Sequence, residues 1–276
     1  MERANINTLL DKLDSDDGTL QVASLMNMVD DKDYASVPKI LRLLKSPAAD
    51  IRSSAAYALG YLGRQDLESV GAALMDSLDD PEEIVRSEVV EAMGELSYIR
   101  AVASIEYLLR NDASPLVRAS AAESLGNLGV SEAIYSLELA LLDVDEDDSV
   151  RAFSANSMGL LATEQLLPKL AEYVRAEHSL SVKAELLAAM YYQGAIEAMN
   201  QLLSLLDNAD ESLAINILNI LTDLTEREMR SSLAEDGPDI HNTLERCARR
   251  FPILGTHAEE IVATMDRRSL REKSGF

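Results

Sequence analysis

The sequence predicts an all-α fold, an α/α superhelix of about seven two-helix repeats followed by a C-terminal helical cap. Three observations predict this class. A segment of 13 residues recurs along the chain, its small and apolar residues follow a helical spacing, and no Asn-Gly or Asp-Gly hairpin signal lies between alternating runs. With 47% hydrophobic residues in 276, the chain has enough apolar side chains for a core.

The recurring segment is strongest in five copies. They read IRSSAAYALGYLG (51–63), VRSEVVEAMGELS (85–97), VRASAAESLGNLG (117–129), VRAFSANSMGLLA (150–162) and VKAELLAAMYYQG (182–194), with weaker copies at 20–32 and 213–225. Their second positions are 31 to 34 residues apart and hold Gln21, Arg52, Arg86, Arg118, Arg151, Lys183 and Ala214. Positions 1, 5, 8, 9 and 12 of each copy are apolar or small, which predicts a helix with one buried face.

A second amphipathic segment precedes most copies, so the unit is predicted to be helix, turn, helix. These segments lie at 37–46, 67–78, 101–110, 133–142, 166–174 and 195–206. Pro38 and Pro168 stand near the starts of two of them, where a helix loses least from a missing N–H group.

Seven of the twelve glycines occupy two positions of the repeat. Those inside the predicted helices cost ~1 kcal/mol each relative to alanine, so they predict close contact between neighbouring helices. They are Gly60, Gly94, Gly126 and Gly159. The others stand where a helix ends, and they predict left-handed caps. They are Gly63, Gly129 and Gly194.

An acidic residue stands six positions before the basic residue of four copies. These acids are Asp80, Asp112, Asp145 and Glu177, which precede Arg86, Arg118, Arg151 and Lys183. We expect acid and base to alternate along stacked repeats and to bind the turn backbone, because each repeat of a solenoid contacts only its neighbours. Such a ladder predicts a structural role.

The segments ADIRSSAAYALGYLG and PLVRASAAESLGNLG resemble the HEAT-like repeats first described in phycobilisome lyases. The resemblance implies a HEAT-like solenoid over residues 1–225. It implies no single activity, because the repeat occurs in enzymes, chaperones, adaptors and regulators. Residues 226–276 depart from the pattern and are predicted to form the helical cap and a basic tail, with a loop at 235–239 and a frayed end.

The residue types of common catalytic and metal sites are sparse. His178, His241 and His257 are not followed by Glu, whereas deoxyhypusine hydroxylases, a similar repeat family, use His-Glu pairs to hold two irons. We therefore interpret the histidines as exposed, and Cys247 as a buried small side chain on one helical face. The run DVDEDD (143–148) lacks the glycine and glutamate of a calcium loop, which favours a solvated turn. The sequence predicts no catalytic residue, no metal and no cofactor.

The charge is strongly negative, with 25 basic and 48 acidic residues and a net value of −23. An acidic body repels phosphate, so we expect no nucleic-acid or anionic membrane partner. A saline habitat is an alternative reason for this acidity. The absence of a long apolar run and of a signal-peptide pattern, with a single cysteine, predicts a cytoplasmic protein.

Repeat positions 3, 4, 7 and 11 are expected to stay open on the inner wall of the superhelix. They place tyrosines at one end, glutamates next, and apolar or aromatic residues further along, a mixture that is typical of protein-binding surfaces. The predicted partner-binding residues are Tyr57, Tyr61, Glu88, Glu91, Glu95, Glu123, Asn127, Phe153, Asn156, Leu160 and Tyr192. The alternative is a solvated face with scattered apolar residues.

The sequence and the family resemblance indicate two alternative functions. The acidic stripe favours a non-catalytic scaffold or adaptor that holds a protein client with a basic, flat or helical surface. The family resemblance implies an alternative: a bilin lyase, or a factor that chaperones or detaches phycobilin on phycobiliproteins. In that case a bilin would contact the tyrosines and acids of the stripe.

Overall fold

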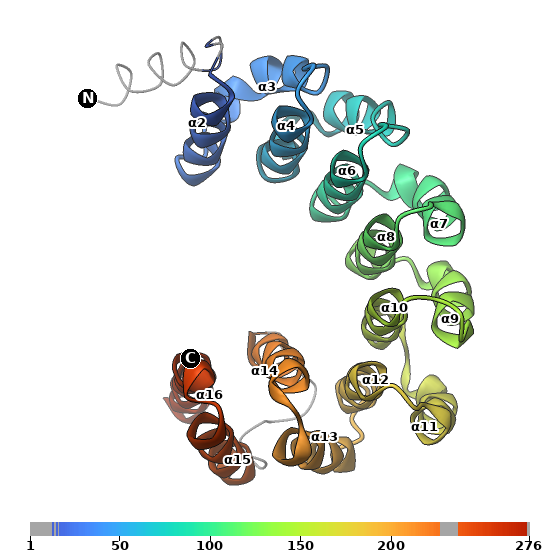
Figure 1. Ribbon diagram of the computed structural model, residues 1–276, viewed down its shortest axis with the longest axis vertical. Coiled ribbons are helices and arrows are strands. Elements are labelled where there is room, and N and C mark those ends of the chain that lie inside the picture. The colour runs from blue at the N-terminus through green and yellow to red at the C-terminus, as the bar shows by residue number, and fades with distance from the viewer. Residues whose placement is uncertain (1–12, 14, 16, 227–236, 275–276) are drawn as a thin grey trace. The chain divides into compact units, whose positions relative to one another are not determined.

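The computed structural model describes residues 13, 15, 17–226 and 237–274, and this part of the chain contains helices and no strand (Figure 1). The predicted all-α class of paired helices is confirmed. The α-helices are α2 (Gly18–Asp30), α3 (Val37–Leu43), α4 (Ala49–Leu62), α5 (Leu67–Met75), α6 (Glu83–Glu95), α7 (Val102–Asn111), α8 (Pro115–Leu128), α9 (Ile134–Leu142), α10 (Asp148–Leu161), α11 (Leu167–Ala176), α12 (Leu180–Tyr192), α13 (Glu197–Asn208), α14 (Glu211–Glu226), α15 (Gly237–Arg250) and α16 (Gly255–Ser274).

The chain divides into two compact units, Met1–Ser157 and Met158–Phe276. In the first unit, helices α2, α4, α6 and α8 pack on one another in a row, and the intervening helices form a second layer outside them (Figure 1). We call the helices of the row the inner helices. Their small and β-branched residues are buried on more than one side, as in α8, where nine residues from Val117 to Leu128 are inaccessible to solvent or nearly so.

In the second unit, α12 packs against α14 and α14 against α16, while α13 packs against α15. Helices α15 and α16 therefore continue the stack beyond residue 225. The proposed division into a solenoid at 1–225 and a cap at 226–276 stays a prediction. The loop predicted at 235–239 is wrong for residues 237–239, which form the start of α15. Residues 235–236 of that loop and the end of the basic tail at 275–276 lie outside the described residues.

Short 3-10 turns precede five of the outer helices, which the repeat pattern did not indicate. They are Tyr34–Ser36, Gly63–Asp66, Ile99–Ala101, Ser131–Ala133 and Glu164–Leu166. A sixth, Pro252–Leu254, lies instead between α15 and α16. Each turn tightens the chain as it passes from one helix to the next, which is a common use of 3-10 geometry.

The predicted left-handed caps are confirmed at Gly129 and Gly194, whose φ angles are 70° and 92°. The prediction is wrong for Gly63, which has a φ of −78°. That glycine is needed for space, because a Cβ atom there would lie 2.7 Å from Cγ1 of Val70. Ser97 takes the left-handed conformation in the corresponding turn after α6, with a φ of 55°.

The glycines inside the helices mark close contacts, as predicted. A Cβ atom on Gly60 would lie 3.1 Å from the Cα atom of Ala92, and one on Gly126 would lie 2.5 Å from Oγ of Ser157. Gly94 faces Ser124 in the same way within the first unit, and Gly159 faces Ala189 in the second. The cost of glycine in each helix is offset by the closer packing of the next one.

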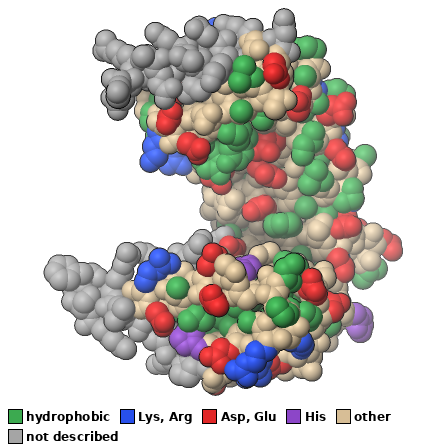
Figure 2. All heavy atoms as spheres, turned by 60° about the vertical axis from the view of Figure 1, so that its left-hand side comes forward, with side chains coloured by type: hydrophobic (Ala, Val, Ile, Leu, Met, Phe, Trp, Pro, Cys, Tyr) green, Lys and Arg blue, Asp and Glu red, His purple; other side chains and the backbone are tan. Residues whose placement is uncertain are grey.

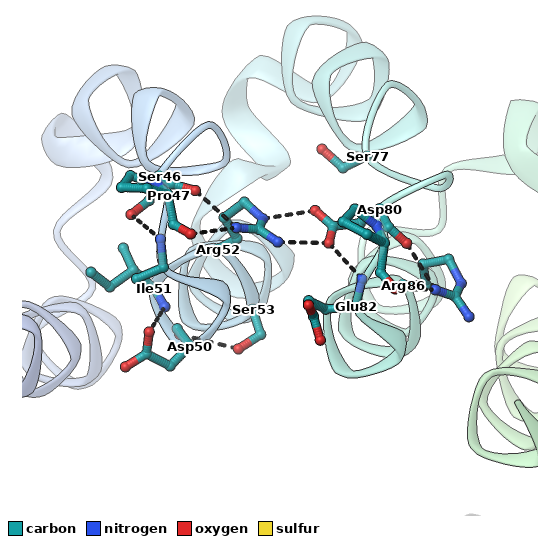
Figure 3. Close-up of polar contacts among 12 residues, drawn as sticks. Ser46, Pro47, Asp50, Ile51, Arg52, Ser53, Ser77, Asp80, Glu82 and Arg86 are labelled. Atoms are coloured by element: carbon teal, nitrogen blue, oxygen red, sulfur yellow. Dashed lines mark hydrogen bonds and ion pairs between the residues drawn. The ribbon is translucent and has the colours of Figure 1, made fainter.

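An arginine–carboxylate ladder joins consecutive repeats of the first unit (Figure 3). Arg52 donates from Nε and Nη2 to the two carboxylate oxygens of Asp80, at 2.7 and 2.8 Å, and from Nη1 to the carbonyl oxygen of Ser46, at 2.9 Å. Arg86 makes the same contacts with Asp112 and with the carbonyl oxygen of Asp80. Each turn is therefore held from both sides, as the alternation of acid and base predicts.

The third rung differs from the prediction in its acid. Arg118 donates to both carboxylate oxygens of Glu146, at 2.7 and 2.6 Å, so Asp145 is not the partner. The backbone N–H of Asp145 is turned toward the carboxylate of Asp143 within the tight turn. The longer side chain of the next residue, Glu146, spans the distance to Arg118.

The ladder generates a prediction about stability. Arg52 and Asp80 are both largely buried, so Arg52→Ala leaves a carboxylate without its counter-ion and lowers the free energy of unfolding by about 3 kcal/mol. The matched control is Arg100→Ala, because the Arg100–Glu68 pair is exposed and its loss costs less than about 1 kcal/mol. Urea unfolding followed by circular dichroism measures both, and equal effects would contradict a structural role for the ladder.

Candidate functional site

A pocket opens on the inner helices α4, α6 and α8 of the first unit, with a cavity of about 80 Å³. We call it the acidic pocket. Its lining residues are Tyr57, Tyr61, Glu88, Glu91, Ala92, Glu95, Glu123, Ser124 and Asn127. Seven of the predicted partner-binding residues therefore lie together around one hollow.

Repeat geometry explains why these residues meet. Positions 7 and 11 of a copy are four residues apart and share one face of a helix. The first copy places Tyr57 and Tyr61 there, and the second places Glu91 and Glu95. The ladder and the glycine contacts hold α4, α6 and α8 in register, so these faces line up across three successive repeats.

The two tyrosines form an aromatic wall. The ring centroids of Tyr57 and Tyr61 are 4.9 Å apart, with an angle of 49° between the ring planes. Tyr57 is half-buried, whereas 49% of Tyr61 is exposed. Burial, followed by the negative charge of Glu95, raises the pKa of Tyr61 to about 12. The phenol therefore stays neutral at ordinary pH and its ring offers an electron-rich face.

Glu91 is held in a fixed position by two serines. Its Oε1 atom accepts hydrogen bonds from Oγ of Ser120, at 2.6 Å, and from Oγ of Ser87, at 3.3 Å. The two hydroxyl groups are 2.8 Å apart. Both serines are buried between α6 and α8, so the expectation that repeat positions 3 and 4 are open is wrong for them. The close approach of these helices turns Ser87 and Ser120 into supports for the carboxylate.

Glu88 has the opposite environment. Burial, and then repulsion from the nearby Glu91, raises the pKa of the Glu88 carboxyl to about 7. Within the described part of the chain, Glu88 has no hydrogen-bond or ion-pair partner, and the residues that line the pocket include no Lys, Arg or His. Arg64 reaches this region, but it donates to the backbone carbonyl of Glu95. The lining of the pocket therefore carries four carboxyl groups and no cationic side chain.

Acidic and apolar side chains also lie together on the surface seen in Figure 2, where Lys and Arg gather in a few small groups. Four predicted partner-binding residues fall outside the acidic pocket. Phe153 (39% exposed) and the half-buried Asn156 and Leu160 lie on α10, and Tyr192 ends α12. A role in binding for these four stays a prediction.

The three histidines and the cysteine differ in burial. Cys247 is buried, as predicted, and burial raises the pKa of its thiol. His178 is exposed, but the prediction of exposure is wrong for His241 and His257, which are half-buried. Nε2 of His257 lies 2.9 Å from Oγ1 of Thr222 and so links α16 to α14. Among the described residues, no group of three or more His, Cys, Asp and Glu is arranged to hold a metal ion.

Comparison with known families explains the repeat. The family described as HEAT repeats matches residues 6–94, 71–143 and 102–191, which together cover more than half of the chain. The chain belongs to the HEAT-repeat family. This confirms the resemblance that the sequence pattern predicted.

The similarity to individual proteins either covers a small part of the chain or has a low sequence identity. The deoxyhypusine hydroxylases of Neosartorya fischeri and Aspergillus fumigatus are each 40% identical to it over 81 residues, which is 29% of this chain and 23% of theirs. The chain thus matches less than a quarter of the length of these relatives. A solved structure of the complex of CpcE and CpcF of phycocyanin lyase from Nostoc sp. PCC7120 aligns over 93% of both chains, with a TM-score of 0.56 and 19% identity. That likeness shows a shared fold. In the described part of the chain, no helix has the length and apolar character needed to cross a membrane.

The raised pKa of Glu88 predicts that this residue lowers the free energy of unfolding as the pH rises. As the pH rises from about 4.5 to 7, the unfolded chain loses the Glu88 proton and the folded chain keeps it, so ionisation at higher pH disfavours folding. We expect Glu88→Gln to raise the free energy of unfolding by about 1 to 3 kcal/mol at pH 8, with less than half of that gain at pH 5.5.

Denaturant titrations at both pH values test this expectation. Glu95→Gln is the matched control, because Glu95 lies exposed at the rim of the same pocket. A gain for Glu88→Gln that is equal at the two pH values, or a loss at pH 8, would contradict it.

Proposed function

We propose that this HEAT-repeat protein is a non-catalytic scaffold that holds a protein client through the acidic pocket. The client surface that fits is basic, because the pocket presents four carboxyl groups beside two tyrosines. Aromatic anchors next to charge are characteristic of protein-recognition surfaces. Stacked helical repeats commonly serve as binding surfaces of this kind.

The observation that carries the proposal is a preformed pocket whose lining has four carboxyl groups and no cationic side chain. Carboxylates that have a structural role in this chain are paired, as the ladder shows for Asp80 and Asp112. Glu88 and Glu91 of the acidic pocket have no guanidinium partner among the described residues, and Ser87 and Ser120 hold Glu91 in place. A basic client would supply the missing counter-charge.

A second function is supported by the fold of the phycocyanin lyase complex. In this alternative the chain acts as a bilin lyase, or as a factor that chaperones or detaches phycobilin on phycobiliproteins. The cavity of about 80 Å³ argues against complete enclosure of a bilin, because pockets that enclose drug-sized ligands measure roughly 300 to 1,000 Å³. The iron chemistry of deoxyhypusine hydroxylases is not proposed, because none of the three histidines is followed by Glu.

The test is affinity capture from a lysate of the source cells. The full chain is compared with Glu91→Lys/Glu95→Lys and with Asp76→Lys/Asp79→Lys, which makes the same charge change at exposed acids outside the acidic pocket. We expect a basic protein to be retained by the wild type and by the Asp76/Asp79 variant, and to be lost from the Glu91/Glu95 variant. Mass spectrometry identifies the protein, and circular dichroism checks that each variant keeps its helices.

Two other outcomes decide between the functions. Equal recovery by all three chains would contradict the proposal that the acidic pocket binds a client. Recovery of phycobiliprotein subunits with visible absorbance, at the expense of any basic client, would replace it with the bilin-related function.

A further inference from the structure

The acids of the ladder and Glu88 of the acidic pocket differ in their partners, although both lie in the first unit. The ladder acids Asp80, Asp112 and Glu146 are each largely buried, and each receives two hydrogen bonds from one guanidinium group. Glu88 is half-buried, and it receives no hydrogen bond from a guanidinium group among the described residues. The half-buried carboxylate in the pocket therefore lacks the guanidinium that balances comparable groups elsewhere.

The second observation is the free side of Glu91. Ser87 and Ser120 both bind its Oε1 atom, so within the described residues its Oε2 atom has no hydrogen-bond donor. The two serines orient the carboxylate in advance, which reduces the entropy lost when a ligand binds. Glu88 and Glu91 are three residues apart on α6, so they project from the same side of that helix.

The third observation is the aromatic wall. Tyr57 and Tyr61, from α4, line the hollow together with Glu88 and Glu91 from α6. A planar guanidinium stacks on a tyrosine ring and at the same time donates in its own plane to carboxylates. An ammonium group is a more strongly hydrated point charge and matches this geometry less well. The small cavity, about 80 Å³, suits the head group of one side chain.

We propose that the acidic pocket receives a single arginine side chain of the client, with its guanidinium against the rings of Tyr57 and Tyr61 and its N–H groups donating to Glu88 and Glu91. This inference rests on the proposed function and names the chemistry of the contact. Glu95 and Glu123 add negative charge at the mouth of the pocket.

Binding of arginine to the acidic pocket should become tighter as the pH rises. A guanidinium binds the ionised form of Glu88, which is populated as the pH rises through about 7. The neighbouring groups Glu91, Glu95 and Glu123 are acidic, Tyr61 stays neutral, and no Lys, Arg or His lines the pocket. The nearby Arg64 donates to the backbone carbonyl of Glu95. We expect arginine to bind about fivefold more tightly at pH 8 than at pH 6, because a charge-assisted hydrogen bond is gained.

The experiment uses the full chain with labelled tyrosines, followed by nuclear magnetic resonance. The probe is Nα-acetyl-arginine amide, compared with Nα-acetyl-lysine amide and with Nα-acetyl-citrulline amide, which has nearly the same shape and no charge. Substitutions Tyr57→Phe and Tyr61→Phe assign the two ring signals. We expect saturable shifts of these signals with arginine, weaker shifts with lysine and none with citrulline.

Two variants and a metal control test whether the arginine probe binds specifically in the acidic pocket. Glu88→Gln should weaken arginine binding about fivefold at pH 8 and remove its pH dependence. Tyr107→Ala, which removes an exposed tyrosine on the outer helix α7, should leave it unchanged. Equal binding of citrulline, no effect of Glu88→Gln, or tighter binding of Ca²⁺ than of arginine at the same signals would overturn the proposal. So would the absence of any saturable shift at tens of millimolar probe.

This outcome can be separated from failure of the proposed function. If the arginine probe does not bind but the client is still lost from the Glu91→Lys/Glu95→Lys variant, the scaffold function stands and the arginine contact is wrong. If neither the probe nor a client depends on the pocket, both proposals fail.

Discussion

The fold of the first unit depends on the arginine–carboxylate ladder. Each guanidinium binds the backbone of its own turn and the carboxylate of the next, so neighbouring repeats cannot slide without breaking several charge-assisted bonds. A largely buried ion pair adds little net stability over apolar packing, because both charges lose their water. Its contribution here is register, while the close glycine contacts, such as Gly60 against Ala92, set the separation of the inner helices.

The same register gives two acidic residues opposite properties. The hydrogen bonds from Arg52 hold the pKa of Asp80 below its usual value, whereas burial near Glu91 raises the pKa of Glu88 to about 7. Arg86 of the ladder and Glu88 of the acidic pocket are only two residues apart on α6. The ladder supplies a guanidinium to Asp80, Asp112 and Glu146, whereas Glu88 has no such partner among the described residues. The carboxyl group of Glu88 therefore has a perturbed pKa on a helix that is packed between α4 and α8. Groups with perturbed pKa values mark candidate functional sites.

The sequence predicted the parts of the structure that repeat. Helix positions, glycine contacts and the meeting of Tyr57, Glu91 and Glu123 follow from a period of 31 to 34 residues and from helical spacing. Features that depend on distances of a few ångströms were not predictable. The choice of Glu146 over Asp145 depends on side-chain length in one irregular turn, and the support of Glu91 by Ser120 depends on how closely two helices approach. The 3-10 turns have no residue type in common, so no sequence pattern signalled them.

A HEAT-repeat fold does not determine what a chain binds, and the distribution of its side chains shows why. The residues that define the stack are repeat positions that face neighbouring helices, such as Arg86 and Gly94. The tyrosines and glutamates that line the acidic pocket occupy other positions, which three successive repeats bring together without contributing to the ladder. Substitutions at these positions can change the charge and shape of the pocket while the stack is kept. Relatives with the same repeat can therefore differ in function, and the specificity of this chain is to be sought in the carboxyl groups of the acidic pocket and in its two adjacent tyrosines.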